Sequence, residues 1–305
     1  MAKKFKKKSS IKVSTGRKIF LVINATVLII YAIVCMLPFF NLLAISLSDA
    51  AHVDAGEVIF IPKGINFSAY VYLLEQKDFW ASFWVSIQRV VIGTAIALVI
   101  NVLAAYPLSR PKKKFKGRGI YVAIFVVTMF FNGGLIPNYL LVGALGLKNT
   151  IWSLVLPVAL NAWNMVLLVN FFKDVPSELI EAAEIDGASQ FQILTKVILP
   201  ISLPALATVT LFTVVAHWNN WFDGSIYIKV GEGVPPLQTY IYQMIDEIKY
   251  LSLSDDPADK ELLATLPDKS LRSAQIFIAM IPIMLVYPFV QRYFIKGLTQ
   301  GGVKE

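Results

Sequence analysis

Few side chains in this sequence are suited to covalent or metal chemistry. The 305 residues include one cysteine, Cys35, and two histidines, His52 and His217. One thiol excludes a disulfide framework, and so few Cys and His residues exclude a metal site built from several of them. We therefore predict no catalytic residue and no metal site, and we look for function in binding surfaces instead.

The segment 174–200 has the pattern of two short helices joined by a bend. Pro176 suits the first turn of a helix, and Gly187 can end that helix because glycine adopts a positive φ at no steric cost. A second helical stretch follows and ends before the next apolar run. Its apolar stripe comprises Phe191, Leu194, Val197 and Ile198.

The first of these two helices is suited to dock in a groove of another protein. Ala182 and Ala183 would allow another backbone to approach closely. The alternative is a helix lying on lipid, but anionic headgroups would repel its acidic side chains. Those side chains are Glu178, Glu181, Glu184 and Asp186.

Polar side chains within apolar runs are a second group of candidates, because a polar group in lipid is costly and usually functional. Amides pair with sugar hydroxyls and indole rings stack on sugar C–H faces, so this set suits a carbohydrate. We expect Asn161 and Asn164 near the middle of one span and on one face of its helix. The candidate substrate-pathway residues are Arg89, Asn161, Asn164, His217, Trp218 and Asn219.

Each of these residues has a structural alternative that the sequence leaves open. Trp218 could belong to the aromatic belt at the membrane interface, and the two Asn residues could bond helix to helix. His217 could be a packing residue. Arg89 could extend to the outer surface instead of contacting an anionic sugar.

The composition indicates a membrane protein made of helices. Hydrophobic residues make up 56% of the chain, charged residues 16%, and the mean hydropathy is +0.64. A span of the hydrocarbon core needs about 20 apolar residues in a helix. We predict an all-α, polytopic membrane bundle of six transmembrane helices, with no room for a nucleotide-binding domain. The predicted spans are about 19–43, 82–106, 119–141, 151–172, 203–222 and 274–294.

Basic residues predict the orientation of the bundle. Eight Lys and Arg residues precede the first span, and six lie in the short loop 110–118. Cytoplasmic loops carry such an excess, so both termini and segment 174–200 are predicted to be cytoplasmic. The basic segment 1–18 is then an orientation signal that touches anionic lipid, and nucleic acid is not an expected partner. Segment 223–272 falls outside the cell, as a connector or a partner-binding loop.

Two sets of motifs resemble one known family, the first in segment 174–200 and the second elsewhere in the chain. Glu181-Ala182-Ala183, Asp186-Gly187-Ala188 and Ile198-Leu199-Pro200 resemble the cytoplasmic coupling loop of ABC importer permeases. Leu194 stands where many members carry Phe. Segments 105–110, 132–137, 145–150 and 218–222 resemble the carbohydrate-uptake branch. Over residues 19–298 the chain is similar to the smaller six-span permease subunit of maltose-type importers, with a type I importer fold.

The resemblance implies a set of partners and roles. A second permease subunit would complete the pore, two cytoplasmic ATPase subunits would bind ATP and Mg, and an extracytoplasmic solute-binding protein would deliver a sugar. This chain has no G-x-x-x-x-G-K-S/T motif, which agrees with ATP binding on another chain and with no cofactor here. Loop 223–272 would reach the binding protein. The residues implied in ATPase coupling are Glu181, Ala182, Ala183, Asp186, Gly187, Leu199 and Pro200.

The expected function is therefore a transport subunit, not an enzyme, in the cytoplasmic membrane of a prokaryote. It would form half of the pore for a carbohydrate, most simply an oligosaccharide. A stand-alone secondary transporter or channel is the alternative, although the predicted spans contain no Asp or Glu for proton coupling. An importer of a non-sugar solute also stays open. A membrane enzyme would need a cluster of titratable groups that the sequence does not offer.

Overall fold

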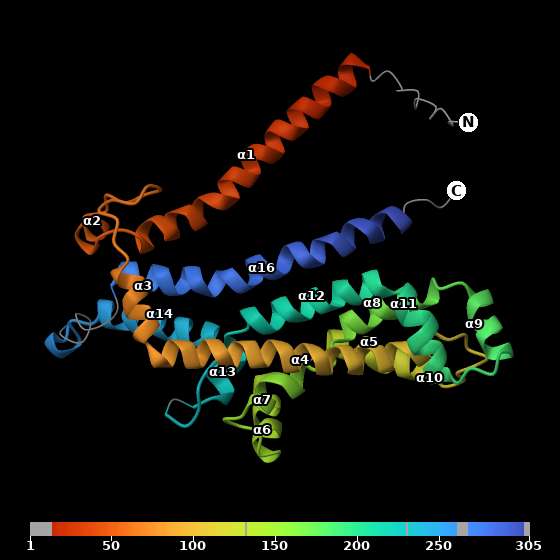
Figure 1. Cartoon of the computed structure of the whole chain (residues 1–305). Coiled ribbons are helices and arrows are strands. Elements are labelled where there is room, and N and C mark those ends of the chain that lie inside the picture. Colours follow the sequence, from red (N-terminus) through yellow and green to blue (C-terminus); the bar gives the residue numbers. More distant parts are fainter. Residues whose placement is uncertain (1–13, 132, 230, 261–267, 302–305) are drawn as a thin grey trace. The chain divides into compact units, whose positions relative to one another are not determined.

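A computed structural model describes residues 14–131, 133–229, 231–260 and 268–301, so most of the basic segment 1–18 and part of loop 223–272 lie outside it. Every regular element in the described residues is helical, as predicted (Figure 1). The elements are α1 (Thr15–Ser46), α2 (Ala50–Asp54), α3 (Ser68–Glu75), α4 (Lys77–Ser109), α5 (Arg118–Phe130), α6 (Leu135–Ala144), α7 (Ile151–Val155), η1 (Leu156–Val158), α8 (Ala162–Lys173), α9 (Ser177–Ile185), α10 (Gln190–Gln192), the π-helical η2 (Ile193–Ile198), α11 (Leu199–Ile201), α12 (Leu203–Asn219), α13 (Phe222–Tyr227), α14 (Leu237–Leu253) and α16 (Lys269–Gly301).

Six apolar helical segments match the six predicted spans, but three of them are broken. Helices α1 and α4 and residues 269–288 of α16 are each long and apolar enough to cross a membrane alone. The other three candidates are pairs of helices: α5 with α6 bends by 114°, α7–η1 with α8 by 49°, and α10–α11 with α12 by 83°. The breaks in these three segments were not indicated by the sequence. Gly134, at φ +87°, and the prolines of η1 and α11–α12 lie at these breaks.

The described chain forms two compact units, of which the smaller contains residues 14–70 and 268–277. In it α1 is apolar all round and almost wholly exposed, which fits a helix surrounded by lipid or by another subunit. The turn after α1 is fixed by polar contacts. The hydroxyl groups of Ser46 and Tyr70 form a hydrogen bond of 2.7 Å, and the backbone N–H of Lys63 donates to Ser48 Oγ at 3.0 Å.

The larger unit is organised around α4, which contacts α8, α12 and α14 (Figure 1). Buried positions recur on one face of α4 every three or four residues, and most of them carry small side chains. Small residues let helix backbones approach closely where lipid offers no hydrophobic driving force. Buried positions on this face include Ser82, Ser86, Arg89, Gly93, Ala97, Asn101 and Ala105.

The break before α8 is stabilised by two asparagines. The side chain of Asn161 caps α8 by accepting the backbone N–H of Asn164 at 3.0 Å. Asn101 of α4 donates to the carbonyl of Ala159, at 3.2 Å, across the break. Carbonyls freed by a break inside a membrane need such partners. Asn161 and Asn164 therefore do not share one helical face in mid-span as predicted, because Asn161 lies at the start of a helix.

The capping role of Asn161 gives a first prediction. Replacing Asn161 by Ala should lower the stability of the protein by about 1 kcal/mol, because the first turn of α8 loses its acceptor. Asn161→Ser retains a capping oxygen and serves as the matched control. Thermal unfolding of the purified protein in detergent would measure both; equal midpoints for the Ala and Ser variants would contradict the capping role.

A second prediction concerns the close approach of α4 and α12 at Gly93. A Cβ atom at this position would lie 2.5 Å from Nε2 of His217. Gly93→Ala should therefore destabilise the protein by about 1–3 kcal/mol through overpacking. Gly119→Ala in α5, where a Cβ would meet nothing within 4 Å, is the control. Adding His217→Ala to Gly93→Ala should recover the loss, and a loss that persists in the double variant would refute the contact.

Candidate functional site

Segment 174–200 forms the predicted two helices with a bend at Gly187. Helix α9 begins after Pro176 and ends at Ile185, and Gly187 has φ +77°, which a residue with a side chain rarely adopts. The second helical stretch starts with a capping box between Ser189 and Gln192. The angle between the two stretches is therefore set by local backbone chemistry.

This segment is packed onto the ends of α4 and α8. Ile180 of α9 and Ile193, Leu194 and Ile198 of η2 are buried in one cluster with residues of α4 and α8, including Leu108 and Phe172. Leu194, the position where many family members carry Phe, is 3% exposed. Because protein interiors are densely packed, a displacement of the segment must displace α4 and α8 as well.

Polar contacts add to this attachment. Lys114, in the basic loop 110–118, pairs with Glu184 of α9 at 2.6 Å, and the Tyr106 hydroxyl bonds to Oε1 of Gln190 at 2.6 Å. The hydrogen bond from Lys114 holds the pKa of the Glu184 carboxyl below its usual range. A lowered pKa means that the contact stabilises the fold above about pH 4.5, the usual value, and is lost as the pH falls through the lowered pKa.

The opposite side of the segment is exposed and mixes apolar and acidic groups. Ile185 is 86% and Phe191 67% exposed, so Phe191 does not lie on the buried face of Leu194 and Ile198, with which the sequence grouped it on one apolar stripe. The cause is the π-helical turn, which shifts the register of the residues after Gln192. Among the predicted coupling residues, Glu181, Ala182, Asp186, Gly187 and Pro200 are exposed, and Ala183 and Leu199 are half-buried.

A second candidate site is a polar cavity of about 150 Å³ in the larger unit, bounded by α4, α8 and α12. Four of the six predicted substrate-pathway residues meet here. Asn164 donates to Thr213 at 3.4 Å, so the alternative of helix-to-helix bonding also holds for this residue. The cavity is lined by Arg89, Ala97, Val158, Asn161, Asn164, Thr213, Ala216, His217 and Asn220.

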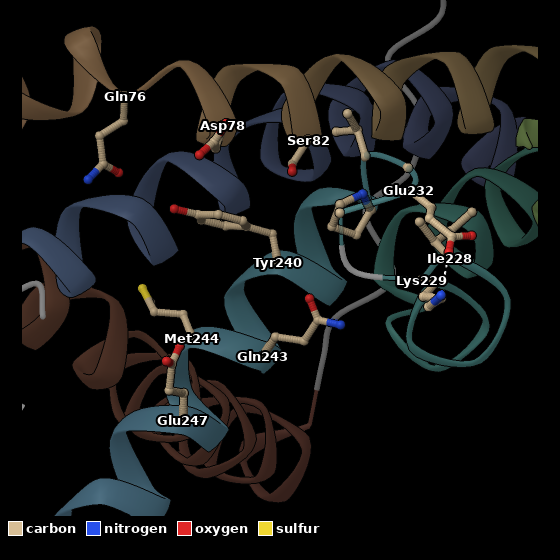
Figure 2. Close-up of a pocket in the computed structure, with 14 residues that line it drawn as sticks. Gln76, Asp78, Ser82, Ile228, Lys229, Glu232, Tyr240, Gln243, Met244 and Glu247 are labelled. Atoms are coloured by element: carbon tan, nitrogen blue, oxygen red, sulfur yellow. Dashed lines mark hydrogen bonds and ion pairs between the residues drawn. The ribbon is translucent and has the colours of Figure 1, made fainter. Parts of the chain in front are cut away.

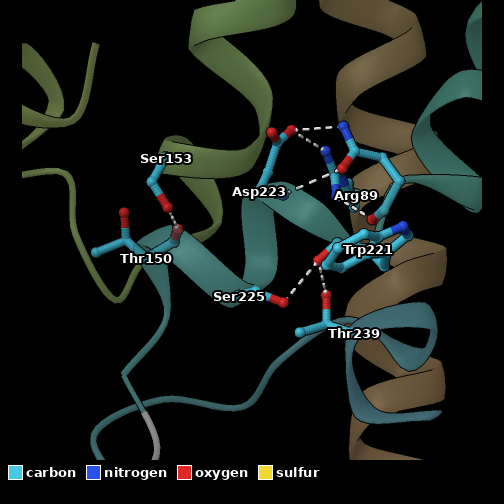
Figure 3. Close-up of polar contacts among 8 residues, drawn as sticks. Arg89, Thr150, Ser153, Trp221, Asp223, Ser225 and Thr239 are labelled. Atoms are coloured by element: carbon cyan, nitrogen blue, oxygen red, sulfur yellow. Dashed lines mark hydrogen bonds and ion pairs between the residues drawn. The ribbon is translucent and has the colours of Figure 1, made fainter. Parts of the chain in front are cut away.

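Arg89 is fully buried and paired, which excludes the alternative that it extends to the surface. Its Nη2 donates to Oδ2 of Asp223 at 2.6 Å, and its Nη1 donates to the carbonyl of Asn220 at 2.9 Å (Figure 3). Asn220 Nδ2 donates to the same oxygen of Asp223 at 2.7 Å. A guanidinium buried among apolar helices requires such a counter-charge.

Trp218 and Asn219 lie apart from the residues lining this cavity. Trp218 is 3% exposed, donates its indole N–H to the carbonyl of Ala279 at 3.0 Å and packs edge-on against Phe83. A buried indole is not part of an interfacial belt exposed to lipid headgroups, so that alternative is wrong for Trp218. Asn219 is exposed at the last residue of α12.

Sequence reasoning missed Asp223, Asn220 and Thr213 as parts of this site. The need for a counter-ion near a buried arginine is the signal that could have indicated Asp223, which directly follows the fifth predicted span. Thr213 lies one helical turn before His217 on α12 and gives no sequence signal of its own.

A larger pocket, of about 800 Å³, lies between the start of α4, the loop 228–235 and α14. Figure 2 shows Tyr240 of α14 opposite Asp78 and Ser82 of α4, and Gln243 of α14 also lines the pocket. The pocket therefore offers an aromatic ring, amides and carboxylates. Segment 223–272 contains a helix here: α14 buries Leu237 and packs on α4.

Residues 102–300 match the family described as binding-protein-dependent transport system inner membrane component. The chain is 37% identical, over 91% of its length and 95% of the relative's, to the polygalacturonan/rhamnogalacturonan transport system permease protein YtcP of Bacillus subtilis. It is 28% identical, over 94% of its length and 97% of the relative's, to the trehalose/maltose transport system permease protein MalG of Thermococcus litoralis.

One solved structure is similar over nearly the whole chain. It is a bacterial ABC transporter involved in the import of the acidic polysaccharide alginate, with 34% identity and a TM-score of 0.81, covering 93% of this chain and 100% of that chain. The similarity therefore extends from the sequence to the three-dimensional fold. The chain thus belongs to the family of inner-membrane components of binding-protein-dependent transport systems, the permeases of ABC importers.

Proposed function

We propose that this chain is a membrane-spanning subunit of an ATP-driven importer of an oligosaccharide, and that segment 174–200 receives the mechanical input. The observation that carries the proposal is the two-sided structure of this segment. One side is packed into the core at the ends of α4 and α8, and the other is exposed with apolar and acidic groups. The names of the relatives at 37% and 28% identity support a carbohydrate as the substrate.

The exposed side suits a groove on a separate ATPase. Ile185 and Phe191 supply apolar anchors on either side of Gly187, and Ala182 leaves room for a second backbone. Glu181 and Asp186 add charge at the rim and would meet basic or polar groups. Leu199 and Pro200 then join the docked segment to α12. ATP and Mg would be bound by two such ATPase subunits, and this chain would perform no bond chemistry itself.

Closure of the ATPase pair would move segment 174–200, and the packed ends of α4 and α8 would follow. A second permease subunit would form the other half of the pore, and rocking of the two halves would expose the site to alternate sides of the membrane. The polar cavity beside Arg89 lies along α4 and is our candidate for part of the substrate pathway.

We propose an orientation that agrees with these contacts. The Lys114–Glu184 pair supports a location of the basic loop 110–118 and segment 174–200 on the same side of the membrane. The excess of basic residues favours the cytoplasm for that side and for both termini. Segment 223–272 then faces outward, where its pocket is accessible to a solute-binding protein.

A direct test is carbohydrate-dependent ATP hydrolysis by the complex purified with its partner subunits and reconstituted in lipid. We expect the chain to co-purify with a second permease and an ATPase, and hydrolysis to rise when the loaded solute-binding protein is added. Transport of an oligosaccharide by this chain without an ATPase would contradict the proposal and favour a stand-alone transporter.

The bend at Gly187 provides a sharper test of coupling. Valine at this position is strained, because the left-handed conformation costs an L-residue about 1–2 kcal/mol, and a shift of that size changes an equilibrium about 5- to 30-fold. We expect Gly187→Val to lower the amount of sugar imported per ATP hydrolysed, or to weaken binding of the ATPase, by a factor in this range.

Gly187→Asn is the matched control, since asparagine tolerates a positive φ and a side chain here would meet nothing within 4 Å. The control should transport like the wild type. Any loss of stability of the permease pair in the valine variant should not exceed this strain of about 1–2 kcal/mol, because a side chain at this position meets nothing within 4 Å. Normal coupling in the valine variant would remove the bend from the mechanism.

A further inference from the structure

The buried cation Arg89 has hydrogen-bonding capacity left after its structural contacts. Its side chain is 0% exposed, Nη1 and Nη2 are bonded, and Nε has no hydrogen-bond partner among the described residues. Guanidinium groups bind carboxylates side-on through two adjacent N–H groups. An unpartnered Nε–H beside a bonded Nη2–H leaves half of such an edge open.

The cavity beside Arg89 presents hydrogen-bond donors and no carboxylate among the residues that line it in the described chain. Asn161, Asn164 and Asn220 contribute amides, and His217 contributes an imidazole. Asp223 holds Arg89 from outside the lining. An anion that displaces Asp223 from Arg89 would interact with the guanidinium charge in surroundings of low dielectric, where charge interactions are strong.

The present counter-ion is held in a way that allows exchange. The Asp223 carboxylate contacts Arg89 through one oxygen, Oδ2, and that oxygen also accepts a bond from Asn220. Asp223 lies on the short helix α13, and its side chain is 18% exposed. Moving away from Arg89 would therefore leave Asp223 with its Asn220 bond and access to water.

We propose that Arg89 recognises a carboxylate of a uronate-containing oligosaccharide, which takes the place of Asp223 during transport. This inference rests on the proposed function and names the substrate class of the same pathway. When no substrate is bound, Asp223 pairs with Arg89 and keeps the site neutral. A neutral sugar has no charge to replace that of Asp223, so the ion pair stays closed and the sugar is bound more weakly.

The test measures ATP-dependent uptake by the reconstituted complete complex. Trigalacturonate and trimannuronate are each compared with their fully methyl-esterified forms, which differ only in charge and the ester methyl groups. For the wild type we expect KM for at least one acid to be about tenfold or more below that of its ester, the size of one hydrogen bond to a charged group.

Variants separate recognition from structure. Arg89→Gln combined with Asp223→Asn keeps polar groups at both positions without an unpaired charge, and should bring the acid-to-ester KM ratio close to one while ester uptake persists. Asp223→Asn alone removes the competing carboxylate and should lower KM for the acid. Thr239→Val removes a bond to the carbonyl of Trp221 beside α13, at 2.7 Å, and should leave the ratio unchanged.

If the double variant does not assemble, Arg89→Lys keeps the charge and should raise KM for the acid but not for the ester. The inference is overturned if the wild type does not distinguish acid from ester, if it imports a neutral oligosaccharide but neither acid, or if the ratio survives in the double variant. Absence of any ATP-dependent carbohydrate uptake would instead overturn the proposed function.

Discussion

The packing of segment 174–200 against the ends of α4 and α8 is the interaction on which the mechanism depends. The cluster around Leu108, Phe172 and Ile198 is buried and close-packed, so its parts can move only as one body. Apolar contacts are not directional and would allow segment 174–200 to slide along α4 and α8. The Lys114–Glu184 ion pair and the Tyr106–Gln190 hydrogen bond fix its position. In the proposed mechanism, the exposed side of the segment can transmit force only because its reverse side is anchored in this way.

Helix α4 links this anchor to the polar cavity. Arg89 and Leu108 lie on the same uninterrupted helix, separated by about 28 Å at 1.5 Å per residue. The small residues on its buried face let α8 and α12 pack closely, and Gly93 leaves space for His217 one turn from Arg89. A tilt of α4 imposed at its Leu108 end would thus change the distance between Arg89 and Asp223, since Asp223 belongs to α13.

The sequence was sufficient to predict six apolar segments and the two-helix form of segment 174–200. Both depend on local chemistry: run length and charge in the first case, Pro176 and Gly187 in the second. The breaks within three spans, the exposure of Phe191 and the pairing of Arg89 with Asp223 were not predictable in this way. The π-helical turn and the pairing of Arg89 with an aspartate 134 residues away depend on tertiary packing, and the hydrophobic periodicity of the sequence carries no information about either.

The location of the cavity at helix breaks has a physical reason. A break inside a membrane leaves backbone groups without helical partners, and lipid cannot satisfy them. Here Asn161 caps α8 after the break that follows η1, Asn101 donates to the carbonyl of Ala159, and the carbonyl of Asn220, after the end of α12, accepts from Arg89. Side chains that meet this backbone requirement necessarily gather polar groups at one place in an apolar bundle. The same constraint that limits where helices can break therefore provides the hydrogen-bonding groups that a polar substrate needs.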